Sequence, residues 1–178
     1  MVDTLRTERL ILRPLRASDA GPMTLYAADP RVARMTTSIP HPYPPGAAAA
    51  YIERVAERAA RERAWAIDAT PVGSAELVGV ISYKPVTGAL GYWVGPPFWN
   101  TGYATEALAC LVDHLFETEG VDALGASVFA DNPASIQVLQ KAGFVAAGET
   151  MEYAVARGGP ARSLAFRLAR PAQARAAE

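Results

Sequence analysis

One segment of the chain places a glycine-containing turn directly before a strongly amphipathic helix. Its sequence is Trp99-Asn100-Thr101-Gly102-Tyr103-Ala104-Thr105-Glu106-Ala107. The first amides of a helix lack an intrahelical acceptor, and together with the helix dipole they offer a cluster of donors to an anion. Gly102 and Ala104 leave little side chain in the way. The segment therefore predicts a phosphate site; the alternative is an ordinary loop whose glycine eases entry into the helix.

A second segment, residues 131–144, is a short helix with clear signals at both ends. Asn132 suits the N-cap, Pro133 the first helical position, and Gly143 the place where helices often end in a left-handed residue. The better-known phosphate loops are excluded by spacing, since no G-x-x-x-x-G-K-S/T and no complete G-x-G-x-x-G follows a strand. The chain thus contains two helix starts, each with free amide donors.

The elements around these segments alternate in type. Aromatic and β-branched runs typical of strands precede both segments, and the prolines after Gly95 end the first run because proline cannot donate to a sheet ladder. The expected helices are 18–28, 46–63, 104–115 and 133–142, and the expected strands are 8–14, 64–69, 77–83, 88–94, 123–129, 145–156 and 163–168. The strands between residues 64 and 94 are expected to form an antiparallel meander.

Length and composition favour one domain, residues 1–169, followed by a small polar tail, 170–178, that is expected to fray. The chain has 178 residues, 51% of them hydrophobic, and a formal net charge of −1. This charge argues against nucleic acid as the main ligand, because neutralising a phosphate backbone needs a basic face. No apolar run approaches the roughly 18 residues that cross a bilayer, so we predict a cytoplasmic protein without membrane attachment.

Cysteine and histidine offer no metal or disulfide chemistry. The one cysteine, Cys110, lies within the amphipathic helix, and we expect a buried structural thiol. His41 lies in a proline-rich loop, and the alternatives for it are a residue beside the substrate or a part of the loop alone. His114 lies among apolar residues with no second histidine or cysteine at metal-binding spacing. We therefore predict no metal site.

The two segments resemble the paired motifs of the GNAT superfamily of N-acetyltransferases. Within it they resemble the RimJ/RimL branch of ribosomal-protein N-terminal acetyltransferases, with Trp-x-x-Gly-Tyr-Ala-Thr-Glu-Ala at 99–107 and Asn-Pro-Ala-Ser followed by Lys-x-Gly-Phe at 132–144. The opening run Thr7–Arg13 and the loop His41-Pro42-Tyr43 are similar to further parts of the family. The likeness spans about residues 5 to 169.

The resemblance implies the α/β (α+β) GNAT fold. This fold has a central mixed, mostly antiparallel sheet of about seven strands, helices on both faces and one pair of strands splayed apart. The resemblance also implies acetyl-CoA as co-substrate, with its pantetheine arm in the gap between those strands. The backbone of Trp93 and Val94 would bind the pantetheine and the acetyl carbonyl, Asn132 the pantetheine amides, and Ser135 would lie near the sulfur. The diphosphate would be bound by the amides of Asn100, Thr101, Gly102, Tyr103 and Ala104.

Acetyl transfer to an amine needs a base for the amine and an acid for the leaving thiolate. Many members of the superfamily carry a tyrosine two residues before the lysine of Lys-x-Gly-Phe, but this chain has Leu139 there. Ser135 is therefore the predicted acid, as the RimJ/RimL branch implies. The alternative is that a serine in the first turn of a helix serves local hydrogen bonding alone.

Glu149 and Glu152 are the candidates for the base. They lie on the expected strand 145–156, where alternation puts them on opposite faces, so at most one points into the cleft. Glu149 is the predicted base, and a solvated strand carboxylate is the alternative. Asn100 and Thr101 depart from relatives that have glycine and lysine there, so one positive charge is missing beside the predicted diphosphate.

The sequence leaves three functions open. The first is an acetyl-CoA-dependent N-acetyltransferase acting on a primary amine such as a protein N-terminus. The second is a small-molecule acetyltransferase acting on an antibiotic, a polyamine or an amino acid. The third, of another class, is a catalytically weak sensor that binds acyl-CoA. Either a monomer or a homodimer is compatible with the sequence.

Overall fold

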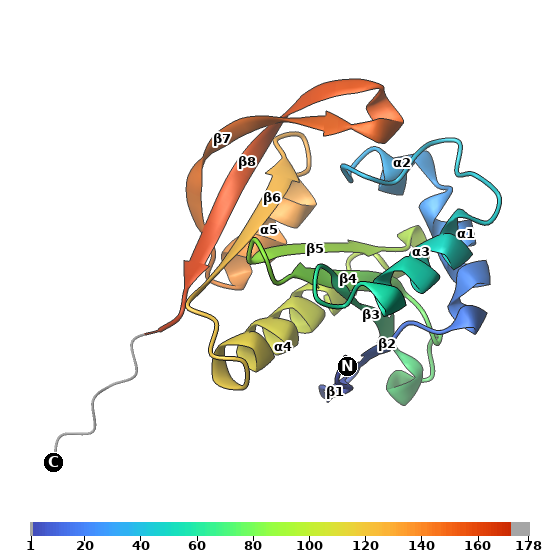
Figure 1. Cartoon of the computed structure of the whole chain (residues 1–178), viewed down its shortest axis with the longest axis horizontal. Helices are drawn as coiled ribbons and strands as arrows, with labels where there is room; N and C mark the ends of the chain where they lie inside the picture. The colour runs from blue at the N-terminus through green and yellow to red at the C-terminus, as the bar shows by residue number, and fades with distance from the viewer. Residues whose placement is uncertain (1, 172–178) are drawn as a thin grey trace, which may run out of the picture.

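Eight strands form one sheet in the computed structural model, which describes residues 2–171. The strands are β1 (Leu5–Arg6), β2 (Ile11–Pro14), β3 (Arg63–Asp68), β4 (Gly79–Lys84), β5 (Ala89–Val94), β6 (Ala123–Phe129), β7 (Val145–Ala154) and β8 (Gly159–Ala169). Their order is β1-β2-β3-β4-β5-β6-β8-β7, and every neighbouring pair is antiparallel except β5 and β6 (Figure 1). The predicted mixed, mostly antiparallel sheet is confirmed. It has an additional strand because β1 precedes the single strand expected at 8–14. Of the tail expected to fray, residues 172–178 lie outside the described part.

Helices cover both faces of the sheet, as predicted. They are α1 (Ala20–Ala27), α2 (Pro30–Ala33), α3 (Ala47–Glu57), α4 (Tyr103–Glu117) and α5 (Pro133–Lys141). The expected helix 46–63 is wrong at its end, because α3 stops at Glu57 and the residues before β3 form turns. α2 has no counterpart among the expected helices. It is a single turn that begins with Asp29 as N-cap, whose carboxylate accepts from the Arg31 amide at 2.8 Å.

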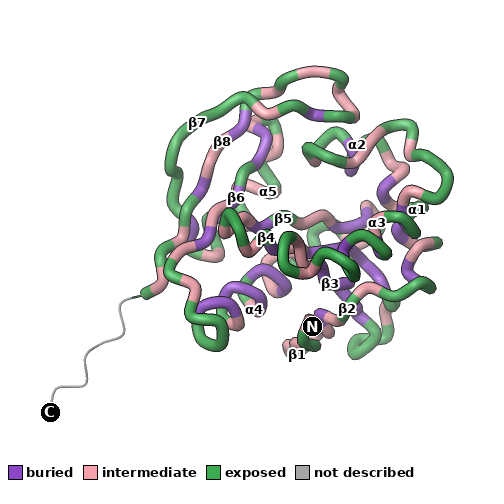
Figure 2. The backbone as a smooth tube through the Cα atoms, viewed as in Figure 1, coloured by how far each residue is buried: buried purple, intermediate pink, exposed green. Residues whose placement is uncertain are grey.

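Two apolar clusters hold the helices against opposite faces of the sheet. On the first face, here the α4–α5 face, Leu108 and Leu111 of α4 and Leu139 of α5 are buried in one cluster with the central strands. On the second, the α1–α3 face, Met23 and Ile52 are buried in the other cluster. Figure 2 shows the inner side of α4 buried, whereas β7 is exposed along nearly its whole length.

The parallel pairing of β5 and β6 stops soon after it begins. Only Ala89 with Gly125 and Leu90 with Ala126 are in register. β5 then continues to Val94 beside β4, while β6 pairs along its entire length with β8, so the two strands part (Figure 1). The predicted splayed pair of strands is therefore confirmed.

The register between β4 and β5 decides which backbone groups face this gap. The Gly95 amide donates to the Val78 carbonyl at 2.8 Å. Antiparallel pairs alternate between residues that exchange hydrogen bonds and residues that do not. Trp93, two positions before Gly95, therefore directs its backbone groups to β4. Those of Tyr92 and Val94 are turned toward the gap.

A buried ion network joins β2 to β3 and to the segment that precedes α1. Arg13 donates to both oxygens of Asp19, at 2.9 and 2.8 Å, and to Asp68 at 2.9 Å. Burial alone would raise the pKa of Asp68, but hydrogen bonds from Thr70 and Arg13 outweigh it and hold the pKa below its ordinary value. The stability that Asp68 adds is therefore present above its unfolded pKa and is lost as the pH falls.

Replacing Arg13 by methionine is expected to destabilise the fold by about 3–5 kcal/mol, because Asp19 and Asp68 then stay buried without their counter-ion. Arg162→Met is the matched control, since the side chain of Arg162 is 62% exposed and pairs with Glu149 at the surface. It should cost about 0–1 kcal/mol. Chemical denaturation of both variants measures the difference. Equal losses would show that the Arg13 network adds no more than a surface ion pair.

Candidate active site

The loop before α4 has the conformation that an anion site needs. Gly102 has a φ of 84°, in the left-handed region that favours glycine, and Asn100 has a φ of 62°. The N-cap Gly102 offers no side chain, the Tyr103 amide donates to Thr101 Oγ1 at 3.4 Å, and the first intrahelical bond is from the Glu106 amide to the Gly102 carbonyl at 3.1 Å. The amides of Ala104 and Thr105 therefore remain available to a ligand.

Arg9 binds both this loop and the first turn of α4. It donates from Nη1 to the Thr101 carbonyl at 3.0 Å and from Nε to Glu106 at 2.7 Å, and its guanidinium lies 5.2 Å from the centre of the Tyr103 ring. Burial alone would raise the pKa of Glu106, but hydrogen bonds from Thr7 and Arg9 outweigh it and keep the pKa below its ordinary value. Sequence reasoning missed Arg9, because 97 positions separate it from Glu106.

The loop also fixes the end of β5. The indole Nε1 of Trp99 donates to the Val94 carbonyl at 2.7 Å. With its carbonyl occupied, Val94 keeps its amide as the group directed into the gap between β5 and β6. This arrangement fits the predicted role of Val94. It fits Trp93 less well, because the backbone of Trp93 is directed to β4 and its side chain packs on the α1–α3 face. The role of Trp93 stays a prediction.

The start of α5 faces the same gap from the other side. The Asn132 side chain accepts from the Ser135 amide at 3.1 Å, so its oxygen caps the helix while its amide nitrogen remains free to donate. Ser135 is half-buried, and its Oγ lies 2.8 Å from the hydroxyl of Tyr92 on β5. Residues predicted from separate motifs, Val94 and Ser135, thus lie on the two walls of one gap.

The two candidate carboxylates on β7 lie on opposite faces, as alternation predicts. Glu149 pairs in register with Leu164, whose side chain packs on the α4–α5 face, and Arg162 binds both of its oxygens. This hydrogen bonding lowers the pKa of Glu149. Glu152 instead accepts from Ser127 Oγ at 2.5 Å. Ser127 alternates with β6 residues that pack on the α4–α5 face, so Ser127 and Glu152 lie on the α1–α3 face.

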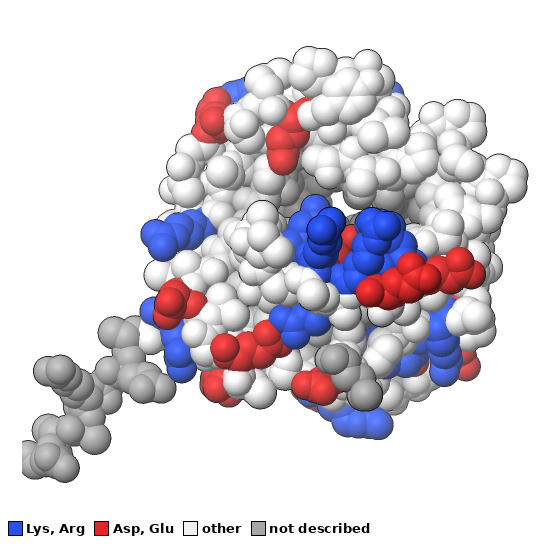
Figure 3. Space-filling view, in the orientation of Figure 1, with Lys and Arg blue, Asp and Glu red and all other residues white. Residues whose placement is uncertain are grey.

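The α1–α3 side of the gap has a framed opening. The Val155 amide, at the end of the β7–β8 hairpin, donates to the Thr37 carbonyl at 3.1 Å, and Arg157 Nε donates to the Arg34 carbonyl at 2.7 Å. These bonds join the hairpin to the segment after α2. Figure 3 shows the surface hollowed between the hairpin and α3, with basic side chains gathered over α3.

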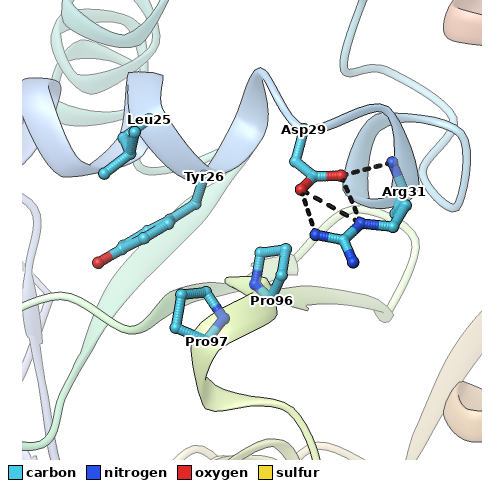
Figure 4. A pocket seen from close by; sticks show the side chains of 6 residues that line it. All are labelled: Leu25, Tyr26, Asp29, Arg31, Pro96 and Pro97. Carbon is cyan, nitrogen blue, oxygen red and sulfur yellow. Dashed lines mark hydrogen bonds and ion pairs between the residues drawn. The ribbon is translucent and has the colours of Figure 1, made fainter.

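A further hollow, of about 450 Å³, lies between the end of α1 and the residues after β5 (Figure 4). It is lined by Leu25, Tyr26, Asp29, Arg31, Pro96 and Pro97. Asp29 and Arg31 bind each other at 2.7 Å, so neither charge is free to select a ligand. The Tyr26 ring packs on the backbone of Gly95, where an added Cβ would lie 2.8 Å from the ring. Tyr26 therefore supports the end of β5, and the lining of this hollow includes none of the predicted site residues.

The fold and the loop together define an acetyltransferase of the GNAT class, and comparisons with known proteins agree. Residues 9–145 match the family described as "Acetyltransferase (GNAT) domain", so the chain belongs to that family. The chain is 28% identical to the uncharacterized N-acetyltransferase YoaA of Bacillus subtilis, a match that covers 96% of this chain and 99% of YoaA.

Solved structures are similar along nearly the whole chain. RimL, described as a ribosomal L7/L12 alpha-N-protein acetyltransferase in complex with coenzyme A, has a TM-score of 0.80 at 17% identity and covers 96% of this chain and 100% of its own. RimJ of Mycobacterium smegmatis has a TM-score of 0.79 at 24% identity, covering 94% and 87%. The predicted resemblance to the RimJ/RimL branch is confirmed for the fold.

Membership in this family makes the protein an acetyl-CoA-dependent N-acetyltransferase, and the chain's own residues fit that donor. The uncapped start of α4 fits a diphosphate, and the parted strands fit a thin extended arm. Among residues 2–171 no three histidine, cysteine, aspartate or glutamate side chains gather as a metal site would need. In the same described part, no helix is long and apolar enough to span a membrane.

Gly102→Asp is expected to weaken acetyl-CoA binding by at least about tenfold, because it sets a carboxylate beside the diphosphate amides. Gly73→Asp is the matched control: its φ of 72° is similar and its Cβ position is open. Ligand at 100 times its dissociation constant adds about 2.7 kcal/mol to stability, so thermal shifts and calorimetry both report the affinity. Equal affinity in the two variants would contradict the placement of the diphosphate.

Proposed function

We propose that this enzyme acetylates the primary amine at the end of a slender chain, and that its acceptor class is the protein N-terminus. The observation that carries this proposal is the framed opening on the α1–α3 face, where Val155 binds Thr37 and Arg157 binds Arg34. An extended terminal segment can pass such a frame, whereas an amine on a folded surface cannot. A linear small amine would also pass, and it is the second candidate.

The similar structures include both kinds of enzyme. RimL is described as an alpha-N-protein acetyltransferase, and a spermidine N-acetyltransferase from Vibrio cholerae, at 15% identity and a TM-score of 0.77, is described in complex with coenzyme A and spermine. Sequence identities this low carry no choice between them. The framed opening selects for a slender acceptor, and the acceptor panel below decides between a peptide and a linear small amine.

In the proposed mechanism, the proton leaves the amine on one face of the sheet and reaches the sulfur on the other. Acetyl-CoA supplies the acetyl group as a thioester. The Val94 amide donates to the acetyl carbonyl oxygen, and Ser135 holds a proton at Oγ on the α4–α5 side, where sulfur would lie. A neutral amine loses one proton at nitrogen while sulfur gains one, so the transfer needs no net proton. The base therefore belongs on the α1–α3 side, from which the amine enters.

Glu152 fits the place of that base better than Glu149, the residue expected from the sequence. Glu152 lies on the α1–α3 face and is held by Ser127 alone among the described residues. Glu149 lies on the other face in an ion pair with Arg162, and the lowered pKa makes it a poorer proton acceptor. The role of Glu149 stays a prediction, and we propose Glu152 in its place.

A panel of acceptors tests the function. Release of free thiol from acetyl-CoA is expected with peptides that carry a free N-terminal amine and not with the same peptides blocked at the N-terminus. Spermidine, amino acids and amino sugars form the small-molecule arm of the panel. Faster turnover of a small amine than of every peptide would overturn the proposed acceptor. Binding of acetyl-CoA without turnover of any amine would favour the sensor.

Glu152→Gln is expected to lower kcat for the best acceptor by about 10²-fold, the usual contribution of a general base. Glu149→Gln makes the same chemical change on the same strand and should cost much less, because Arg162 already occupies that carboxylate. Steady-state kinetics of the two variants decides between them. A larger loss of kcat in Glu149→Gln than in Glu152→Gln would identify Glu149 as the base.

A further inference from the structure

Tyr92 is the one hydroxyl-bearing side chain of β5, and it reaches across the gap to α5. Its hydroxyl lies 2.8 Å from Ser135 Oγ and 3.2 Å from the Ser135 carbonyl. Tyr92 lies beyond Leu90, where the pairing of β5 with β6 stops, and its side chain packs against the α4–α5 cluster. The thin arm predicted to occupy this gap would pass beside these hydroxyls.

We propose that Tyr92 is a positioning residue for Ser135: it donates a hydrogen bond to Ser135 Oγ and so leaves the hydroxyl hydrogen of Ser135 free to bind the sulfur. This inference rests on the proposed role of Ser135. No covalent bond forms or breaks on Tyr92, which keeps its own proton throughout. Tyr92 is thus distinct from a tyrosine that itself protonates the thiolate.

The proposal assigns a direction to the hydrogen bond between Tyr92 and Ser135, in which either hydroxyl can be the donor. A tyrosine hydroxyl has one proton to give and can also accept, and a serine hydroxyl is the same. The Ser135 carbonyl lies inside α5, where the amide four residues later is its normal donor. Ser135 Oγ is the nearer of the two acceptors and has no backbone donor. With the Tyr92 hydroxyl donating to Oγ, the nearer acceptor, the proton of Ser135 points elsewhere.

The surroundings keep Tyr92 protonated. Burial raises its pKa to about 12, and the hydrogen bond with Ser135 offsets only part of that rise. Tyr92 therefore remains a donor across the range in which an amine is acetylated. A serine that accepts one hydrogen bond becomes a better donor in the next, because hydrogen bonds in a chain polarise one another.

The fixed backbone at Ser135 makes this positioning effective. The Ser135 amide is held by Asn132 at 3.1 Å, so the hydroxyl can turn only about its side-chain bond. Leu139, where many relatives have an acid tyrosine, is 1% exposed and part of the core. Tyr92 thus supplies from β5 a phenol hydroxyl next to the thiol site, which α5 lacks at position 139.

Titration of the bound product coenzyme A tests this arrangement without any acceptor. The thiolate absorbs in the near ultraviolet, so the pH at which the thiol ionises can be read in the wild-type complex and compared with free coenzyme A in the same buffer. Donors aimed at the sulfur should lower that pH. Ser135→Ala is expected to raise the pH at which the bound thiol ionises by about 1 unit or more, the effect of one hydrogen bond to a charge.

Tyr92→Phe should also raise the pH at which the bound thiol ionises, by a smaller amount. It should add nothing in the Ser135→Ala background. Ser135→Thr restores a hydroxyl and should restore the sensitivity to Tyr92→Phe. Tyr83→Phe is the matched control, since Tyr83 is also buried in the α4–α5 cluster and its burial also raises its pKa. It should leave the titration unchanged.

The outcomes separate the two claims. If Ser135→Ala raises the ionisation pH and Tyr92→Phe does not, or if their effects add in the double variant, the positioning role of Tyr92 is overturned while the role of Ser135 stands. If Ser135→Ala leaves the ionisation of the bound thiol unchanged, both claims are overturned. A shift in the Tyr83→Phe control equal to that in Tyr92→Phe would mean that loss of any buried phenol suffices, which also overturns the proposal.

Discussion

The active site depends on the early end of the pairing between β5 and β6. After two residue pairs the strands part, because β6 follows β8 while β5 follows β4. A sheet interior normally satisfies every backbone amide and carbonyl within its ladder. Here the backbone groups of Tyr92 and Val94 face the gap between β5 and β6. The indole of Trp99 binds one of these groups, the Val94 carbonyl. We propose that a thin polar ligand takes the place of a neighbouring strand in this gap.

The sheet also separates the proposed acid residues from the proposed base. Ser135 and Tyr92 lie on the α4–α5 side, and Ser127 and Glu152 lie on the α1–α3 side. In the proposed mechanism, the donors for the leaving sulfur and the acceptor for the amine proton are thereby kept apart by the sheet, so that they do not neutralise each other by direct hydrogen bonding. Glu149 and Arg162 lie outside this arrangement because they satisfy each other at the surface.

Local signals were sufficient for much of the fold. The strand at 123–129, the N-cap Asn132 and the left-handed Gly143 were all predictable, because each depends on its sequence neighbours. α2 was not, since a single turn has too short a pattern. Alternation put Glu149 and Glu152 on opposite faces, yet only the register of β7 with β8 tells which face each occupies. The Tyr92–Ser135 contact joins positions 43 apart and has no local signal at all.

A crystal structure of the protein with coenzyme A bound is the most direct test of the central claim. The account predicts diphosphate oxygens within about 3 Å of the amides that follow Gly102 and the sulfur between Val94 and Ser135. Coenzyme A bound elsewhere, with the gap between β5 and β6 empty, would contradict it.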